Sequence, residues 1–321
     1  MAVAARVKPK DFFTDAEWAP LAARSSWKGL WLVAHAWLTI LAAGALFIIW
    51  PNPLTLILAV MIIGARQLGL AILMHDGAHG CLHPNQAVND WIGHWLAGAP
   101  TNGDLRRYRD YHLQHHKFAQ QEEDPDLGLS APFPITRQSL WRKAVRDLTG
   151  QTFYKQRIQP SIDAFKSGKR QNVPFGKIFK GVLTFWSPFL IFHVPVIVVL
   201  SAFGLWWAWP VLWLLPMATW YPLITRLRNI AEHALVGKDQ PDPLRHARTT
   251  LAGPVERLLM APYYVNYHCE HHMFMHVPCW NLPKVHRLLK QKGVMERMLT
   301  APGYLTVLRE ASSKGPVVAA A

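Results

Sequence analysis

The hydrophobic residues of this chain are concentrated in four long stretches. Residues 31–50 contain no charged side chain, and residues 54–74 are nearly as apolar, with one charged residue, Arg66, followed by Gln67. Residues 178–200 contain one Lys near their start, and residues 203–225 contain no charge. A helix of about 20 apolar residues is long enough to span a bilayer. The pattern therefore predicts an all-α integral membrane protein with four transmembrane helices arranged in two hairpins.

The placement of charge predicts the orientation of these helices. The chain has 34 Lys and Arg against 20 Asp and Glu, a formal net charge of +14. The turns 50–53 and 201–204 carry no basic residue, whereas basic residues precede the first stretch and crowd the segment 106–180 and the chain after 226. By the positive-inside rule, both termini and a helical cap formed by 75–177 and 226–321 are cytoplasmic. The excess positive charge then reflects topology and contact with anionic headgroups, and not nucleic acid.

The predicted cap contains two further apolar stripes. Residues 88–99 form an apolar helical face that is too short to span a bilayer, and they are expected to lie at the membrane interface. Leu140, Trp141, Val145 and Leu148 form a second stripe flanked by basic residues, typical of a helix in the headgroup plane or of packing within the cap. No repeat or Gly/Ser-rich linker divides the 321 residues, so one domain is predicted. The three cysteines are odd in number and are expected to be reduced thiols.

Histidine clusters are the main candidates for chemistry. On a helix, positions i, i+3 and i+4 share a face, so each cluster directs its imidazoles one way. Eight imidazoles exceed what one metal binds, since zinc takes about four ligands, and this favours two adjacent metals. Imidazole alone does not identify the metal. The clusters are His75-Asp-Gly-Ala-His79, His112-Leu-Gln-His115-His116 and His268-Cys-Glu-His271-His272.

The position of the clusters indicates which chemistry they serve. The first cluster follows the second apolar stretch, so the predicted metals lie against the cytoplasmic ends of apolar helices, where a lipid tail can enter. Such a tail offers unactivated C–H bonds. Their cleavage calls for dioxygen and a redox-active metal, which zinc is not.

The order and spacing of the clusters resemble the membrane-bound fatty acid desaturase superfamily, which includes hydroxylases and ketolases. The resemblance covers residues 74–293, and Asp124-Pro125-Asp126 after the second cluster adds to it. Members hold two irons with these histidines and with a further His after the fourth span, often preceded by an Asn four residues earlier. The resemblance implies two Fe ions and O2 as co-substrate. The implied metal ligands are His75, His79, His112, His115, His116, Asn229, His233, His268, His271 and His272, with the nine histidines as the catalytic set and Asn229 acting through water.

The resemblance further implies an O2-dependent desaturase that introduces a double bond into a fatty acyl lipid chain. The three residues between His75 and His79 are as in acyl-lipid desaturases and carotenoid enzymes, whereas acyl-CoA desaturases typically have four. His268 stands where front-end desaturases have Gln, which disfavours that subgroup. Electrons must come from an external donor, a ferredoxin or a cytochrome with its reductase, because Cys81-Leu82-His83 supplies only half of a Rieske site.

Two other functions are compatible with the same histidines. A hydroxylase or ketolase of a carotenoid, sterol or acyl chain would use the same site. A His-lined metal transporter is the remote alternative, and it would require ligands near the bilayer midplane on broken helices.

Several polar residues beside these motifs have structural alternatives. His35 and His193 lie inside predicted spans and are expected to be hydrogen-bonded packing residues. Asp76 and Glu270 are adjacent to predicted ligands, and they are candidates to orient imidazoles or to be solvated or salt-bridged carboxylates. The basic run 106–109 is a candidate for contact with lipid phosphate or a donor protein, or is a solvated charge run.

Overall fold

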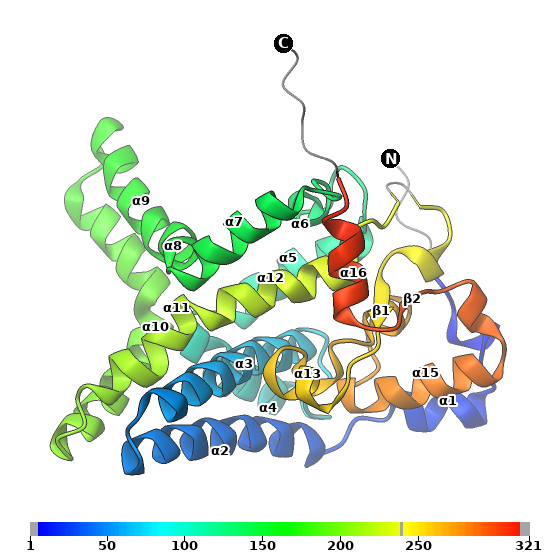
Figure 1. Cartoon of the computed structure of the whole chain (residues 1–321), viewed down its shortest axis with the longest axis horizontal. Helices are drawn as coiled ribbons and strands as arrows, with labels where there is room; N and C mark the ends of the chain where they lie inside the picture. The colour runs from blue at the N-terminus through cyan, green and yellow to red at the C-terminus, as the bar shows by residue number, and fades with distance from the viewer. Residues whose placement is uncertain (1–5, 238–239, 315–321) are drawn as a thin grey trace.

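The computed structural model describes residues 6–237 and 240–314, which are mostly helical (Figure 1). Within these residues, the strands are limited to one parallel pair, in which β1 (Arg248–Thr250) pairs with β2 (Leu299–Ala301). The prediction of an all-α protein is therefore confirmed.

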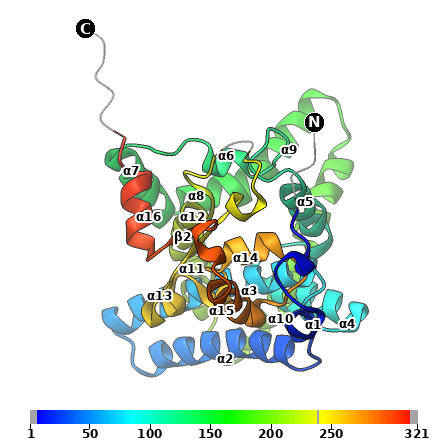
Figure 2. The ribbon, with the colours of Figure 1, turned by 90° about the vertical axis from the view of Figure 1, so that its right-hand side faces the viewer.

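Among the described residues, three helices are long and apolar enough to cross a membrane: α2 (Lys28–Ile49), α3 (Pro53–Ala78) and α10 (Phe175–Ala202). They match the first three predicted spans within a few residues. Asn52 starts α3, because its Oδ1 accepts hydrogen bonds from the backbone N–H groups of residues 54 and 55. Helices α2 and α3 lie side by side (Figures 1 and 2). In α3, 61% of the apolar stretch is buried inside the protein, against 11% in α10, so α3 is central and α10 is peripheral.

The fourth predicted span, 203–225, is not one helix. Pro216 and Pro222 lack the backbone N–H that a regular helix needs, and the helical path breaks between them at Thr219 (φ −122°, ψ −77°). The last helical segment extends beyond residue 225 and carries two of the predicted ligands. The architecture of four spans in two hairpins stays a prediction. The segments are the π-helical turn η5 (Pro210–Leu214), α11 (Leu215–Ala218) and α12 (Trp220–His233).

The two polar residues within α3 are hydrogen-bonded to backbone carbonyls. Arg66 Nη2 donates to the carbonyl oxygens of Arg257, at 3.2 Å, and Leu258, at 2.7 Å. Gln67 Nε2 donates at 2.9 Å to the carbonyl oxygen of Trp213 in η5. Because irregular helical turns release carbonyl groups from their usual partners, polar side chains at these positions supply the missing donors.

The predicted packing roles of two membrane histidines are confirmed. His35 Nδ1 lies 3.1 Å from the hydroxyl oxygen of Tyr263. His193 Nε2 lies 2.9 Å from the carbonyl oxygen of Pro100, and its Nδ1 accepts from Trp209 Nε1 at 3.1 Å. Both rings therefore tie a membrane helix to a neighbouring segment.

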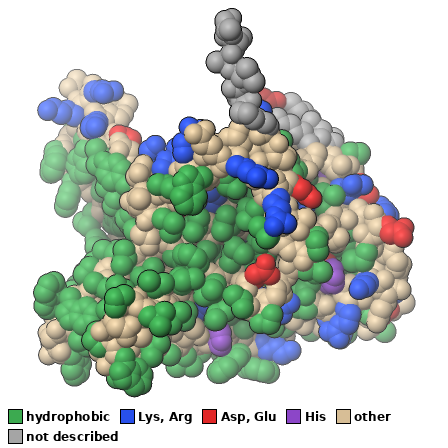
Figure 3. Space-filling view, in the orientation of Figure 1, with side chains coloured by type: hydrophobic (Ala, Val, Ile, Leu, Met, Phe, Trp, Pro, Cys, Tyr) green, Lys and Arg blue, Asp and Glu red, His purple; other side chains and the backbone are tan. Residues whose placement is uncertain are grey.

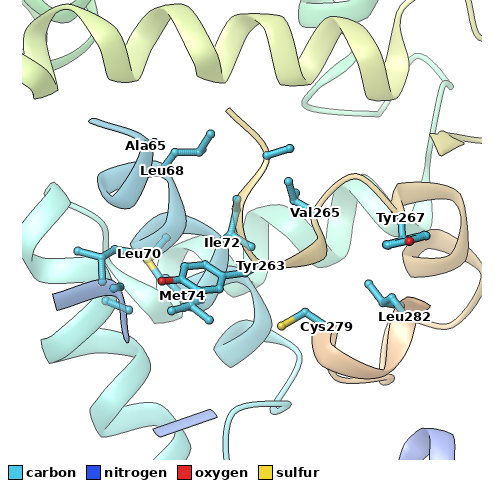
Figure 4. Close-up of a cluster of buried hydrophobic side chains, with 14 of the residues drawn as sticks. Ala65, Leu68, Leu70, Ile72, Met74, Tyr263, Val265, Tyr267, Cys279 and Leu282 are labelled. Carbon is cyan, nitrogen blue, oxygen red and sulfur yellow. The ribbon is translucent and has the colours of Figure 1, made fainter. Parts of the chain in front are cut away.

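The hydrophobic core holds the end of α3 against the segment that precedes α14 (His268–Met273). Figure 4 shows Ile72 and Met74 of α3 near Tyr263 and Val265, and all four side chains belong to one core. Gly69 permits this approach, since a Cβ there would lie 2.6 Å from Cε2 of Tyr263. The packing brings the first and third histidine clusters together.

The two predicted cap stripes are helical. The first is α4 (Gln86–Ile92) continued by the π-helical turn η2 (Gly93–Gly98), and the second is α7 (Arg137–Leu148). Figure 3 shows hydrophobic side chains over the left of the molecule, including α10, and many of the Lys and Arg side chains towards the right and at the tip of α9. The remaining helices are α1 (Asp15–Ala22), α5 (Leu105–Lys117), α6 (Leu127–Ser130), α8 (Gln151–Phe153), α9 (Gln159–Arg170), α13 (Pro254–Leu259), α15 (Leu282–Gln291) and α16 (Tyr304–Ala311).

Candidate metal centre

Four helix segments bring all nine predicted histidines to one place. His75 lies in the last turn of α3, and His79 is the residue that follows its end. Helix α5 supplies the second cluster, α14 supplies the third, and His233 is the last residue of α12. The rings contact one another across these elements: the centroids of His75 and His271 are 4.4 Å apart, and those of His115 and His233 are 5.0 Å apart.

The histidines form two adjacent groups. The first group has five members, whose candidate ligand atoms lie within 4.8 Å of one another. Within it, His116 Nε2 is 2.9 Å from His112 Nε2 and 3.0 Å from His271 Nε2. The three Nε2 atoms thus face one another, which is how the lone pairs of imidazole ligands converge on a bound cation. The first group is His75, His79, His112, His116 and His271.

The second group contains the other four histidines. His268 Nε2 lies 2.8 Å from His233 Nε2 and 3.2 Å from His272 Nε2. His272 Nε2 in turn lies 3.3 Å from His115 Nε2. Helices α5 and α14 each contribute to both groups. Their i, i+3 and i+4 side chains lie on one helical face but point in slightly different directions, so they reach both groups.

The protonation states fit metal binding. Burial, followed by the charges of neighbouring histidines, lowers the pKa of His112, His116, His268 and His272 well below the ordinary value. The same burial lowers the pKa of His271 to about 3. Both ring nitrogens of His79 are buried without a hydrogen-bond partner. Neutral imidazoles with available lone pairs are the form that metals bind.

Asp124 orients one ring of the second group. Its Oδ1 lies 2.7 Å from His115 Nδ1, which leaves His115 Nε2 facing the group. The carboxylate is itself fixed, because Oδ2 accepts from the backbone N–H of Gln120 at 2.9 Å and Oδ1 accepts from that of Asp126 at 2.8 Å. The Asp-Pro-Asp motif after the second cluster therefore supplies a ring-orienting carboxylate.

As to the two alternatives for Asp76 and Glu270, neither carboxylate contacts a clustered imidazole, and Glu270 is instead paired with His286. Asp76 Oδ2 accepts from the backbone N–H of Cys279 at 3.1 Å, and Glu270 contacts His286 Nδ1 at 2.5 Å and the hydroxyl group of Thr249. The helical positions of both carboxylates turn them away from the ligand face, towards the supporting segments.

One residue of the basic run 106–109, Arg109, has a structural role. Arg109 pairs with Asp90 at 2.5 Å, and its Nε donates to the carbonyl oxygen of Ala78 at 2.8 Å. This side chain caps the last turn of α3, where carbonyl groups lack helical partners. Arg109 therefore helps to hold the segment that carries His75 and His79.

Glu232 is a candidate ligand that the sequence motifs did not indicate. It groups with His233 and His268, and its Oε2 lies 3.5 Å from His268 Nε2. Both carboxylate oxygens are buried and lack a hydrogen-bond partner, although Arg228 Nη2 lies 3.2 Å from Oε2. Burial raises the pKa of Glu232 to about 8, against the opposing effect of Arg228. The only sequence signal is its position beside His233 and four residues after a basic residue.

Asn229 lies beside the centre without joining either group. It lines a small cavity next to the histidine cage, by which we mean the two histidine groups together. Its Oδ1 accepts a hydrogen bond from Arg228 Nη2. Its predicted role through a water molecule stays a prediction.

A larger cavity of about 700 Å³ reaches His75 of the first group. Leu68, Ala71 and Ile72 of α3 and Phe185 and Pro188 of α10 form its apolar walls. The lining also includes His75 and Asn229 at the cage, and polar groups at Asp104, Arg107 and Arg157. The cavity thus combines an apolar chamber, a histidine cage and charged groups, and its volume is typical of ligand sites.

Comparison with known proteins indicates a family. Residues 50–300 match the family described as fatty acid desaturase. Dihydrorhizobitoxine desaturase of Bradyrhizobium elkanii is 26% identical over 81% of this chain and 73% of its own length. A beta-carotene ketolase of Paracoccus sp. (strain PC1) is 27% identical over 80% of this chain and 88% of its own length. The sn-1 oleoyl-lipid 12-desaturase of Arthrospira platensis is 23% identical over 68% of this chain and 64% of its own length.

Proposed function

The chain belongs to the fatty acid desaturase family, and we propose that it is an O2-dependent desaturase that introduces a double bond into a fatty acyl chain of a lipid. The observation that supports this best is the cavity of about 700 Å³ that has apolar walls from α3 and α10 and reaches His75 of the first histidine group. Because α10 is mostly exposed and apolar, an acyl chain in the bilayer has a lateral route to the cage.

Two iron ions are the proposed metals. The first group would hold one ion, and the second group, with Glu232 or with Asn229 through water, would hold the other. When bound, the ions would supply the redox chemistry that activates O2 for cleavage of unactivated C–H bonds. The chain's own residues bind the metals, keep the imidazoles neutral by burial and, at Asp124, fix the direction of a ring.

The substrate in this proposal is an acyl chain with a polar head. The apolar walls at Leu68, Ile72 and Phe185 suit the chain, and the methylene groups gain about 0.8 kcal/mol each on burial. Arg107 and Arg157 suit an anionic or polar headgroup at the other part of the same cavity. An amphiphile therefore matches this lining better than a wholly apolar molecule.

A ketolase or hydroxylase is the second candidate. The beta-carotene ketolase matches this chain over more of its own length than the two desaturases do, 88% against 73% and 64%. The same cage would serve either reaction, since desaturation and oxygen insertion both begin at an unactivated C–H bond. The metal transporter is disfavoured, because eight of the nine histidines lie outside α2, α3 and α10.

Electrons would come from a separate ferredoxin, or from a cytochrome with its reductase, on the cytoplasmic side. In this topology both termini and the cage face the cytoplasm, with the turn 50–53 on the other side. Tags at both termini and within residues 151–169 should be inaccessible from outside intact cells, while a tag at 51–53 should be accessible. The reverse pattern would separate the cage from cytoplasmic electrons and would refute the topology.

The deciding experiment is mass spectrometry of lipids and pigments from a host that expresses the chain with a ferredoxin and its reductase under ¹⁸O2. A desaturase gives an acyl product two hydrogens lighter without label. One labelled oxygen in an acyl chain, sterol or carotenoid ring would reject desaturation and support the second candidate. His271→Ala should abolish either product and lower bound iron, whereas His83→Ala, outside both groups, is the matched control.

A further inference from the structure

Helices α7 and α16 approach each other at the start of α7 (Figures 1 and 2). Two surface grooves adjoin there, and none of the nine clustered histidines lines them. The first groove has a volume of about 620 Å³ and is lined by four cations, Arg137, Arg142, Arg309 and Lys314, together with hydroxyl and amide groups. Its lining contains no acidic side chain. Within residues 6–237 and 240–314, none of the four cations has an ion-pair partner. The groove is therefore a concave region of uncompensated positive charge.

The second groove is apolar and adjoins the first. It has a volume of about 320 Å³ and is lined by Leu140, Trp141 and Ala144 of α7 and by two leucines of α12. Arg137 and Ser312 line both grooves, so the two grooves lie next to each other. The lining of the second groove also includes a further arginine, residue 226, which is already paired with a buried carboxylate of α7.

The backbone around the grooves is held by hydrogen bonds. The backbone N–H of Ile135 donates to the carbonyl oxygen of Ala311 at 2.8 Å, and that of Lys314 donates to the carbonyl oxygen of Ile135 at 3.2 Å. Thr136 and Ser313 form an antiparallel bridge at the same place. The start of α7 and the end of α16 are thus linked directly, which fixes the backbone on the two sides of the basic groove.

We propose that the two grooves form a binding site for one anionic phospholipid, with its phosphate in the basic groove and an acyl chain in the apolar groove. The charge matches the phosphate, and the adjoining apolar groove matches the chain. Trp141 is 67% exposed at this site, as expected for an aromatic side chain at headgroup depth. Inorganic phosphate would use only the first groove, and a soluble acidic protein would leave the second one empty.

Helix α12 connects this lipid site to the metal centre. The two groove leucines, Leu223 and Leu227, lie on α12, and the same helix ends at His233. A lipid bound there would hold α7, α12 and α16 together. It would stabilise the folded protein in proportion to its affinity, by the linkage between binding and unfolding.

The test uses the purified full chain in neutral detergent, with dioleoyl phosphatidylglycerol or dioleoyl phosphatidylcholine added, and measures lipid binding by native mass spectrometry and by the shift in thermal unfolding. Binding should favour phosphatidylglycerol. Replacing Arg142 and Lys314 by Ala should weaken it about thirtyfold, at about 1 kcal/mol per cation and 1.4 kcal/mol per tenfold. The control is Lys169→Ala with Arg170→Ala on α9, which removes the same charge outside the groove and should leave binding unchanged.

A second variant separates the lipid from free phosphate. Ala144→Trp should fill the apolar groove and weaken the dioleoyl lipid without changing the response to inorganic phosphate, and Ala144→Leu serves if the larger side chain prevents folding. Equal binding of the two lipids, or equal loss in the α7/α16 and α9 variants, would overturn the proposal. The proposal would also be overturned if the Arg142/Lys314 variant bound lipid as the wild type does but had a raised KM for reduced ferredoxin. That result would make this surface a docking site for the electron donor.

Discussion

Asp124→Asn tests how the protein holds its second histidine group. The wild-type carboxylate is buried, lies 2.7 Å from His115 Nδ1 and accepts two backbone N–H groups. An Asn side chain has only one acceptor oxygen, so its NH2 group must face either a backbone N–H or the ring of His115. The lost charge-assisted hydrogen bond is worth about 1.5–3 kcal/mol. Loss of such an orienting partner lowers metal affinity about 10–100-fold, which is about 1.4–2.8 kcal/mol and agrees with that range.

The effect should be confined to one metal, because His115 belongs only to the second group. Iron-loaded protein is titrated with a chelator, and the iron retained per chain is followed by elemental analysis and by Mössbauer spectroscopy. The wild-type protein should retain two irons, and Asp124→Asn should lose one of them at about 10–100-fold lower chelator concentration. Asp163→Asn, an exposed change on α9, is the control. Release curves that are the same as wild type, or that shift equally for both irons, would refute the role of Asp124.

Three further predictions concern the cavity, the packing and the pH dependence. Ala71→Phe narrows the cavity beside His75 and should shift products to shorter acyl chains in lipid profiling, and an unchanged profile would mean that this cavity does not bind the chain. Gly29→Ala places a Cβ 2.1 Å from the carbonyl oxygen of Leu82 and should cost about 1–3 kcal/mol in thermal unfolding, whereas Gly176→Ala, which meets no atom within 4 Å, should not destabilise the protein. Burial lowers the pKa of His271 to about 3, so below pH 6.5 the unfolded chain binds more protons than the folded one, and the metal-free protein should lose stability as the pH falls from about 6.5 towards 3. Denaturant unfolding at a series of pH values measures this, and a flat profile would contradict it.

Features that depend on local periodicity were determined by the sequence alone. The three helices α2, α3 and α10 follow from uninterrupted apolar stretches, because the length of such a stretch is a property of the chain itself. The grouping of histidines on α5 and α14 follows from their i, i+3 and i+4 spacing, which places them on one helical face before any packing. The family followed from the same motifs.

Only the tertiary structure decided which other side chains contact and orient the clustered histidines. Asp124 orients His115 while Asp76 and Glu270 do not, although all three carboxylates lie near cluster residues in the sequence. The burial of Glu232 beside His268 depends on where α12 meets α14. The group of five histidines, and the four others that contact one another in series, require four helix segments to converge. Sequence spacing predicts which residues share a face of one helix, but the partner of that face depends on how separate helices pack, and that packing is not encoded in any one local pattern.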